Sequence, residues 1–449
     1  MNTLVVGGGG RESAIAASLA KDGVVYAVAP HYNPSLLRYT QATHGRFLRA
    51  HHTEQKAIIQ FAQANRVDLA FISADEPLAA GLVDALLASG IRTVGPTRAG
   101  AQIEWDKHYA LDLMRQIWPG YTPRFWVVRD TTDLEAAIDE ITSLRMDIVV
   151  KPQGLTGGKG VKVMGPHLAD MTAAKRYTLE LLASHPGESV EMVEKLTGPE
   201  FTVMALTDGE HVVMPPCTYD HPYRYTGDRG PGTGGMGAFT TQAPELPFMT
   251  TSQYAECEYI IQGVVDELCR RGLHYNGVLN AGFFATPTGL KFMEFNARFG
   301  DPECMNILCT LATPLSEVLN HIAAGSLSGD RVRFHRLASV VKYLVSPDYA
   351  LREGREYRFH LDSAEIERHG VGVFFAASEQ VDGDLNAYRT IGNSRCVALA
   401  ATDDSIPAAA GRIEAALASY FKGPLEWRAD IGSEHYLRDM LHTTQGGSS

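Results

Sequence analysis

The first hundred residues alternate short apolar runs with amphipathic segments. In the segment that begins at Arg11, Ile15 and Leu19 lie four residues apart, which places them on one face of a helix. The apolar runs are short, as expected for buried strands. The predicted strands are 4–6, 24–28, 68–73 and 91–94, and the predicted helices are 11–21 and 78–89. This regular succession of strand and helix predicts a parallel sheet covered by helices.

The rest of the chain continues the mixed pattern with less regularity. We predict helices over 102–116, 253–271 and 406–420, and strands over 147–150, 190–193, 200–206, 277–285 and 290–295. The segment Thr218–Gly237 is polar, rich in Gly and Pro, and has neither periodicity. A loop of that length inside a compact domain is usually functional or disordered. After Gly325–Gly329, a predicted linker, strand-like segments dominate, so the chain as a whole is expected to be α/β.

Composition and charge narrow the classes of partner. Hydrophobic residues make up 45% of the 449 residues, and no apolar run is long enough to cross a membrane. The net charge of −12, without a basic block, argues against nucleic acid as a partner. The six cysteines form no Cys-x-x-Cys motif, which argues against a structural zinc site and a disulfide framework. We therefore expect a cytoplasmic protein that acts on small molecules.

The glycine run that follows the first predicted strand is a candidate anion site. Gly7–Gly10 precede Arg11 at the start of a predicted helix, where backbone amides attract phosphate. The run departs from the dinucleotide fingerprint because Glu12 replaces its third glycine and the second strand is not followed by the ribose-binding acid. These departures disfavour a nicotinamide oxidoreductase. Another phosphate ligand and a purely structural tight turn both remain open.

Two further motifs indicate nucleotide and metal chemistry. Lys151 ends an apolar strand and precedes the loop Gly154–Gly160, which lacks the order of a Walker loop but offers amide and ammonium groups to a triphosphate. Glu294 and Asn296 share one face of a predicted strand, and their oxygens suit Mg²⁺. Solvated lysines beside a hairpin loop and an exposed strand edge are the respective alternatives.

The long polar segment begins with Asp220 and His221 and closes with a glycine-rich stretch. The many glycines between Gly227 and Gly237 suit a loop that wraps a ligand with its backbone, and a disordered surface loop is the alternative. His221 is a candidate base, but a hydrogen-bonding or packing role is at least as well supported.

Three segments together carry a family resemblance. The stretches 151–160, 230–237 and 294–303 resemble phosphoribosylamine–glycine ligases, which are ATP-grasp enzymes of purine biosynthesis, and the loop 154–160 is similar to their archaeal-type branch. The stretches 9–12 and 428–432 also match, so the resemblance covers nearly the whole chain in the family's order. It departs from the family at Ser13, where a histidine is usual, at Pro222-Tyr223, where a Lys-Arg pair is common, and at Gly282, where the archaeal branch offers a glutamine.

The resemblance implies three domains and a tail. It implies an N-terminal parallel-sheet domain over 1–103, a two-part ATP-grasp domain over 104–328 and a small strand-rich α+β domain over 329–442, followed by a polar tail at 443–449. Within the ATP-grasp domain, it implies a lid at about 120–192 and a central part at 193–328.

The resemblance also implies a role for individual residues. It assigns ATP to Lys107, Lys151, Gly157, Gly158, Lys159, Glu194, Lys195, Leu196 and Glu200, with Lys151 and Arg298 as the catalytic pair. It assigns phosphoribosylamine and glycine to Gly10, Arg11, Glu12, Asp75, Glu76, Asp220, Thr233, Gly234, Gly235, Arg298 and Asp301. It assigns Mg²⁺ or Mn²⁺ to Glu294 and Asn296. The expected reaction joins glycine to phosphoribosylamine with conversion of ATP to ADP. An ATP-grasp ligase for another amine and amino acid is the runner-up, and an inactive nucleotide-binding regulator is disfavoured by the retained Lys151, Glu294 and Asn296.

Overall fold

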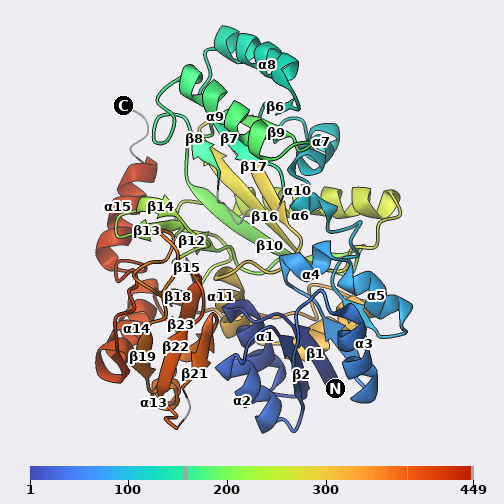
Figure 1. The fold of residues 1–449 in the computed structure, drawn as a ribbon, viewed down its shortest axis with the longest axis vertical. Helices are drawn as coiled ribbons and strands as arrows, with labels where there is room; N and C mark the ends of the chain where they lie inside the picture. Colours follow the sequence, from blue (N-terminus) through green and yellow to red (C-terminus); the bar gives the residue numbers. More distant parts are fainter. Residues whose placement is uncertain (155–159, 382, 446–449) are drawn as a thin grey trace. The chain divides into compact units, whose positions relative to one another are not determined.

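The computed structural model describes residues 1–154, 160–381 and 383–445, and Figure 1 labels its helices and strands. The chain forms two compact units. Unit 1 contains Met1–Ala101, Thr202–Asn280 and the chain from Asn296 onward, and unit 2 contains Gln102–Phe201 and Ala281–Phe295. No helix among the described residues is both long and apolar enough to span a bilayer.

The N-terminal part of unit 1 is a five-stranded parallel sheet, drawn in blue in Figure 1. The strand order is β3-β2-β1-β4-β5, and β1 is buried at its centre because Leu4, Val5 and Val6 are apolar. The strands are β1 (Asn2–Val6), β2 (Val24–Ala29), β3 (Phe47–Arg49), β4 (Leu69–Phe71) and β5 (Thr93–Val94), and the helices are α1 (Gly10–Leu19), α2 (Pro34–Ala42), α3 (Gln55–Ala64), α4 (Asp75–Ala79) and α5 (Leu82–Ala88). The parallel sheet predicted from the sequence is confirmed.

The helix predicted over 78–89 is not continuous in the structure. The segment 78–89 is divided between α4 and α5, and Gly81 between them has a φ of +76°. Glycine adopts this left-handed conformation without steric cost, so it ends one helix and starts the next.

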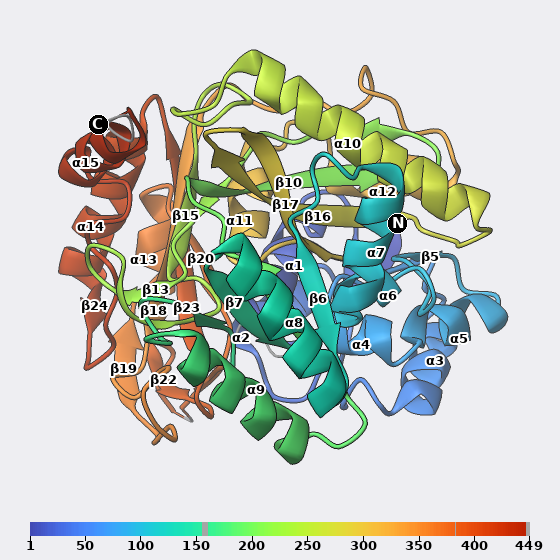
Figure 2. The same ribbon diagram turned by 90° about the horizontal axis from the view of Figure 1, so that it is seen from above.

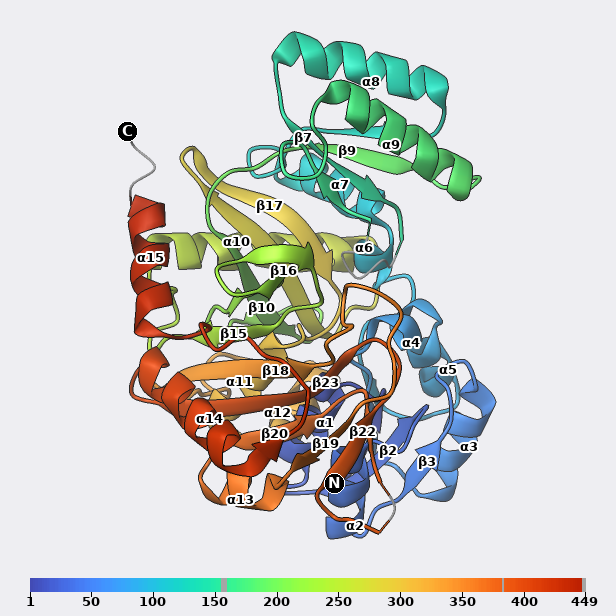
Figure 3. The same cartoon turned by 60° about the vertical axis from the view of Figure 1, so that its left-hand side comes forward.

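The C-terminal part of unit 1 is built from antiparallel sheets (Figure 3). The larger has the order β12-β15-β18-β23-β20, with α14 packed along β18 and β23. The smaller has the order β21-β22-β19-β24. The strands are β12 (Tyr219–Asp220), β15 (Gly237–Thr240), β18 (Ala338–Val345), β19 (Arg358–Leu361), β20 (Gly372–Phe375), β21 (Ser378–Gln380), β22 (Ala387–Thr390), β23 (Arg395–Asp403) and β24 (Phe421–Lys422), and the helices are α11 (Glu303–Thr310), α12 (Leu315–Ala323), α13 (Ser363–Arg368), α14 (Ile406–Tyr420) and α15 (Glu434–Gln445).

The segment Thr218–Gly237 is not a structureless loop, which corrects the prediction from the sequence. Its start, β12, pairs with β15, where Tyr219 stacks on Phe239 with ring centroids 5.3 Å apart. Its middle forms a hairpin of β13 (Tyr223–Tyr225) and β14 (Arg229–Gly232). Such strands of two to four residues are too short to produce a detectable period in the sequence.

Unit 2 contains an antiparallel sheet with the order β6-β9-β7-β8. Helices α8 and α9 lie side by side against it (Figure 2), and a core that includes Ile141, Val150 and Met192 fills the space between. The strands are β6 (Phe125–Val128), β7 (Ile148–Pro152), β8 (Lys162–Val163) and β9 (Val190–Glu194), and the helices are α6 (Gln102–Trp105), α7 (Lys107–Ile117), α8 (Thr131–Leu144) and α9 (Met171–Ser184). The predicted helix 102–116 breaks at Asp106, whose carboxylate caps α7 by accepting the Tyr109 amide.

A further sheet has the order β11-β10-β16-β17. Its strands are β10 (Glu200–Thr207), β11 (Val212–Val213), β16 (Gly277–Thr286) and β17 (Gly289–Asn296), and the long helix α10 spans Thr251–Arg270. The predicted pair of strands around residues 286–289 is therefore present. The whole arrangement agrees with the α/β class expected from the sequence.

Candidate active site

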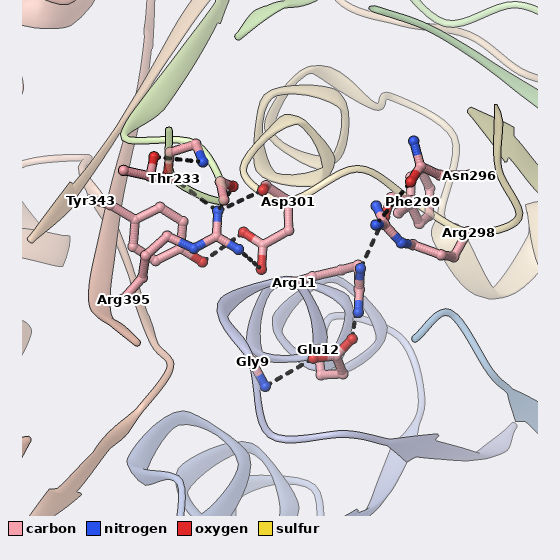
Figure 4. A network of polar contacts seen from close by, with 12 residues as sticks. Gly9, Arg11, Glu12, Thr233, Asn296, Arg298, Phe299, Asp301, Tyr343 and Arg395 are labelled. Carbon is pink, nitrogen blue, oxygen red and sulfur yellow. Dashed lines mark hydrogen bonds and ion pairs between the residues drawn. The ribbon is translucent and has the colours of Figure 1, made fainter. Parts of the chain in front are cut away.

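In unit 1, the start of α1 carries a buried ion pair (Figure 4). The Glu12 carboxylate accepts the Gly9 amide at 2.8 Å, which satisfies one of the free N–H groups that begin a helix. Its other oxygen accepts Arg11 Nε at 2.7 Å, and Arg11 Nη1 donates to the Phe299 carbonyl at 3.1 Å. Gly10 packs so closely on Tyr343 that an added Cβ would lie 2.2 Å from its hydroxyl oxygen. The Arg11 guanidinium, which directly follows the glycine run, is thus buried and held in a fixed position.

A second arginine faces the same carbonyl. Arg298 Nη1 donates to Phe299 O at 3.1 Å, and its Nη2 donates to Asn296 Oδ1 at 3.1 Å (Figure 4). Burial alone would raise the pKa of Asp75 at the start of α4, but the charges of Arg298 and Arg11 and nearby backbone hydrogen bonds lower it overall. Two guanidinium groups and an ionised carboxylate therefore lie in one region of unit 1. The neighbouring Glu76 is exposed.

Asp301 belongs to a neighbouring polar network. Tyr343 donates its hydroxyl hydrogen to Asp301 Oδ1 at 2.7 Å, and Arg395 Nη2 lies 3.1 Å from Asp301 Oδ2. The Arg395 guanidinium also lies over the Tyr343 ring, 4.5 Å from its centroid. The side chain of Asp301 is consequently held in place by two residues that are distant in sequence.

The glycine-rich stretch after β14 lies against this network. Arg395 Nη1 donates to the Gly234 and Gly235 carbonyls, and Thr233 donates its hydroxyl hydrogen to Pro222 O at 2.8 Å. Gly235 has a φ of +98°, and a Cβ there would lie 2.7 Å from Asp220 Oδ1. Only glycine fits this position without displacing the Asp220 carboxylate.

His221 has the environment of a packing residue. Its side chain is fully buried beside the rings of Tyr219, Phe239 and Tyr436. Burial, with the nearby Arg428 charge, lowers its pKa to about 4, so the ring is neutral at neutral pH. Of the two roles left open by the sequence, this burial supports packing and hydrogen bonding.

In unit 2, two lysines converge at the end of β7. Lys107, the first residue of α7, donates its ammonium hydrogens to the carbonyls of Pro152 and Gly154. Burial lowers the pKa of Lys107, and the charge of Lys151 adds to this effect, while the carboxylates of Glu294 and Glu191 oppose it. Residues 157, 158 and 159, which were predicted to contact ATP, lie outside the described residues.

Glu191 is a buried acid that the sequence analysis missed. In the β7–β9 pair it lies directly opposite Lys151, so both side chains project from the same face of the sheet. It is inaccessible to solvent, and among the described residues neither of its carboxylate oxygens has a hydrogen-bond partner. Burial raises its pKa to about 7, although the charges of Lys107 and Lys151 oppose the rise. The only signal in the sequence is a single acid within the apolar run 190–193.

We expect Glu191→Gln to stabilise the protein at pH 8 but not at pH 4.5. The folded state retains the Glu191 proton up to about pH 7, whereas an unfolded chain releases it near the usual value of 4.5. The free energy of unfolding therefore falls as the pH rises through this interval. The fall is roughly 3 kcal/mol if the full difference between the folded-state and unfolded-state pKa of Glu191 contributes. Unfolding of the ligand-free protein from pH 4.5 to 8, with the exposed Glu188→Gln as control, measures the effect. Parallel pH profiles for wild type and Glu191→Gln would contradict it.

Four residues predicted to bind ATP, Glu194, Lys195, Leu196 and Glu200, lie between the end of β9 and the start of β10. The Glu194 carboxylate accepts the Arg124 amide at 3.0 Å, and Lys195 Nζ donates to Asp147 Oδ2 at 3.2 Å and to Met164 O at 2.9 Å. The side chains of both residues thus bond within unit 2. Leu196 is half-buried, and Glu200 at the start of β10 is exposed.

The two predicted metal ligands lie two residues apart on β17, with half-buried side chains. A carboxylate and an amide oxygen match the preference of Mg²⁺ for oxygen ligands. The Asn296 oxygen already accepts a hydrogen bond from Arg298. Gly282 on β16 supplies no side chain, and a Cβ there would lie 2.5 Å from Met293 Cε and 3.7 Å from Glu294 Cγ. The donor set therefore fits a hard divalent cation, with Glu294 as its charged member.

Comparison with known proteins identifies the family of this chain. The family model for the phosphoribosylglycinamide synthetase N domain matches residues 1–104, and that for the phosphoribosylglycinamide synthetase ATP-grasp (A) domain matches residues 106–304. A phosphoribosylamine–glycine ligase of Thermococcus kodakarensis is 37% identical over 437 residues, which cover 97% of each chain. That of Methanothermobacter thermautotrophicus is 39% identical over 444 residues, covering 98% of each chain.

Solved structures show the same fold. A phosphoribosylamine–glycine ligase from Thermotoga maritima superposes with a TM-score of 0.77 at 23% identity, covering 96% of this chain and 100% of the other. The biotin carboxylase domain of the Hydrogenobacter thermophilus 2-oxoglutarate carboxylase, solved with MgADP, ADP and bicarbonate, gives a TM-score of 0.70 at 15% identity, covering 99% and 98%. The fold is therefore that of the ATP-grasp proteins. Within them, the chain belongs to the phosphoribosylglycinamide synthetase family.

Proposed function

We propose that this protein joins glycine to 5-phosphoribosylamine, with conversion of ATP to ADP and phosphate, as a step of de novo purine biosynthesis. The observation that carries the proposal is the near full-length match to phosphoribosylamine–glycine ligases at 37% and 39% identity. The buried Arg11 and half-buried Arg298 of unit 1 and the paired lysines of unit 2 support it, because both the substrate and the nucleotide carry phosphate.

The chemistry requires activation of glycine. A carboxylate is a poor electrophile, so the terminal phosphoryl group of ATP is transferred to a carboxylate oxygen, giving glycyl phosphate and ADP. The amine nitrogen of phosphoribosylamine then attacks the acyl carbon, phosphate leaves with the electron pair of the C–O bond, and the new amide nitrogen loses a proton. No general base is needed if the amine arrives neutral, which agrees with the buried, neutral His221.

The residues proposed to bind ATP belong to unit 2. Lys107 and Lys151 neutralise phosphate charge. Glu194, Lys195, Leu196 and Glu200 line the adenosine. Glu294 and Asn296 would hold Mg²⁺ or Mn²⁺, which supplies charge neutralisation on the phosphoryl oxygens.

The residues proposed to bind glycine and phosphoribosylamine belong to unit 1. Arg298 stabilises the acyl phosphate through its planar guanidinium, which matches phosphate oxygens bidentately. The substrate ligands are Gly10, Arg11, Glu12, Asp75, Glu76, Asp220, Thr233, Gly234, Gly235 and Asp301. The hydrogen bonds that fix Arg11 and Asp301 before any ligand arrives support this assignment, since a preorganised site loses less entropy on binding.

We expect stoichiometric ADP and phosphate, and no AMP, only when glycine, phosphoribosylamine and ATP are all present. Transfer of the terminal phosphoryl group leaves ADP, whereas an acyl adenylate would leave AMP and pyrophosphate. Chromatographic analysis of the nucleotide products with each substrate omitted in turn measures this. AMP as the main product would refute the acyl phosphate route, and an equal rate with alanine in place of glycine would favour a ligase for another amino acid.

A further inference from the structure

Three side chains that can bind a metal ion converge in unit 1 beside the start of α4. His51 and His52 lie between β3 and α3, and Glu76 is the second residue of α4. One ligand atom from each lies within 4.8 Å of the other two. Within the described part of the chain, no other group of three His, Cys, Asp or Glu side chains meets this spacing.

The spacing of the closest pair, which forms an ion pair when His52 is protonated, also fits two ligands of one metal ion. His52 Nδ1 lies 3.3 Å from Glu76 Oε2. N–H···O hydrogen bonds usually span about 2.7–3.2 Å. Two atoms each about 2.0–2.1 Å from one zinc ion are separated by roughly 3.3 Å when the angle between them is close to tetrahedral. The imidazole of His51 lies against that of His52, with ring centroids 4.0 Å apart, so a third nitrogen is close by.

Hydrogen bonds hold the two segments in this arrangement. The Glu54 carboxylate accepts the His51 amide at 2.7 Å, and the His51 ring contacts Thr53 Oγ1 through Nδ1 at 2.9 Å. His51 Nδ1 also accepts the Thr53 amide hydrogen at 3.4 Å, so both contacts hold the ring through Nδ1. Gln55 Nε2 donates to the Ala80 carbonyl at 2.8 Å and so ties the start of α3 to the residue that follows α4.

We propose that His51, His52 and Glu76 form a binding site for one zinc-type transition-metal ion. Two imidazole nitrogens and one carboxylate suit Zn²⁺, Co²⁺ or Ni²⁺, whereas Mg²⁺ prefers oxygen ligands alone. Three protein ligands leave a fourth position for water, and the exposure of His51 and Glu76 makes that position reachable. This set differs in chemistry from Glu294 and Asn296, so the two metal preferences can be told apart.

Zinc titration of the metal-free full-length protein, by competition with a chromophoric chelator, tests the site. Wild type should bind one Zn²⁺ per chain at this site, unaffected by excess Mg²⁺, and should unfold at a higher temperature with Zn²⁺ than without it. His51→Ala and His52→Gln should each weaken this binding at least about tenfold, since each removes one of three ligands. Both variants should retain the wild-type unfolding temperature in the absence of metal.

His435→Gln is the matched control. His435 Nδ1 lies 2.7 Å from Asp439 Oδ2 in an exposed pair of one imidazole and one carboxylate, which belongs to no group of three such ligands among the described residues. Its replacement should leave the titration unchanged. The proposal is overturned if His52→Gln and His51→Ala bind Zn²⁺ as wild type does, or if His435→Gln lowers the affinity as much as they do, which would indicate an adventitious ion only.

Occupancy of this site has a kinetic consequence that rests on the proposed function. Glu76 is among the proposed substrate ligands, so a bound ion withdraws its carboxylate from phosphoribosylamine. Zn²⁺ should therefore raise the KM for phosphoribosylamine without lowering kcat, and His52→Gln should abolish the effect. The chelator titration needs no turnover, so failure of the proposed function leaves the binding result intact. An unchanged KM at full Zn²⁺ occupancy would refute the competition.

Discussion

Glu294→Gln should lower kcat by about a hundredfold or more, because several kcal/mol of charge stabilisation depend on the metal that its carboxylate would hold. The substitution keeps the shape of the side chain and removes only its charge. Glu294 is half-buried on β17, and its charge acts on the pKa of Lys107, which places it beside the proposed phosphate-binding lysines. Gly282 on β16 offers no substitute ligand. Without nucleotide, thermal stability should change little.

Asn296→Ala should be the milder of the two changes. A neutral amide oxygen is a weaker ligand for a hard cation than a carboxylate, and this one already accepts a hydrogen bond from Arg298. ADP release titrated with Mg²⁺ compares both variants with the exposed Glu188→Gln as control. A wild-type rate and Mg²⁺ requirement in Glu294→Gln, or a greater loss in Asn296→Ala, would contradict the assignment.

The fold was predictable where one physical pattern dominates a whole element. Apolar runs separated by amphipathic helices predicted the parallel sheet around β1, because its central strands β1 and β4 are buried and its pairs are parallel. The helix α14 was predicted with both of its ends. The strands β12, β13 and β14 were missed because each has only two to four residues, and because contacts such as Tyr219 on Phe239 leave no local period in the sequence.

The site was predictable only where its residues form local motifs. Arg298 and Asp301 lie in one sequence motif. Arg395 and Tyr343, which bind the Asp301 carboxylate, are distant in the sequence and are brought to it only by the fold. Ser13 likewise donates its hydroxyl hydrogen to the Phe375 carbonyl, more than 300 residues away. Glu191 was missed because a single acid in an apolar run does not show which side chain lies opposite it, and that depends on the register of β9 against β7.

The register of β9 against β7 also helps to explain why Lys151 is the lysine of its sheet that is available to a ligand. Within the described residues, the Lys151 ammonium makes no hydrogen bond or ion pair, although it lies close enough to Glu191 and Lys107 to act on the pKa of both. Lys107 is engaged with the Pro152 and Gly154 carbonyls. Lys162 on β8 lies opposite Val150 and so projects from the other face of the sheet, where its Nζ lies 3.6 Å from the centroid of the Tyr177 ring. Among the described residues, the Lys151 ammonium is therefore the one on this face of the sheet that is free to bind a phosphate.

Lys151→Met should weaken ATP binding by about 10- to 100-fold, since a hydrogen bond to a charged group contributes roughly 1.5–3 kcal/mol. Turnover should fall at least as far, because the same ammonium neutralises charge that develops on the transferred phosphoryl group. The fold should persist because loss of the positive charge raises the pKa of Glu191 further, and the buried carboxyl then takes up a proton instead of remaining ionised.

Lys162→Met is the control that separates a specific contact from loss of positive charge in general. It removes the same ammonium from the same sheet, but one that is paired with Tyr177. Calorimetric titration with a non-hydrolysable ATP analogue, followed by kcat and KM for ATP, should show a large loss for Lys151→Met and little for Lys162→Met. Equal losses would indicate that only the general electrostatic field attracts the nucleotide. Wild-type affinity and turnover in a folded Lys151→Met protein would show that the phosphates bind elsewhere.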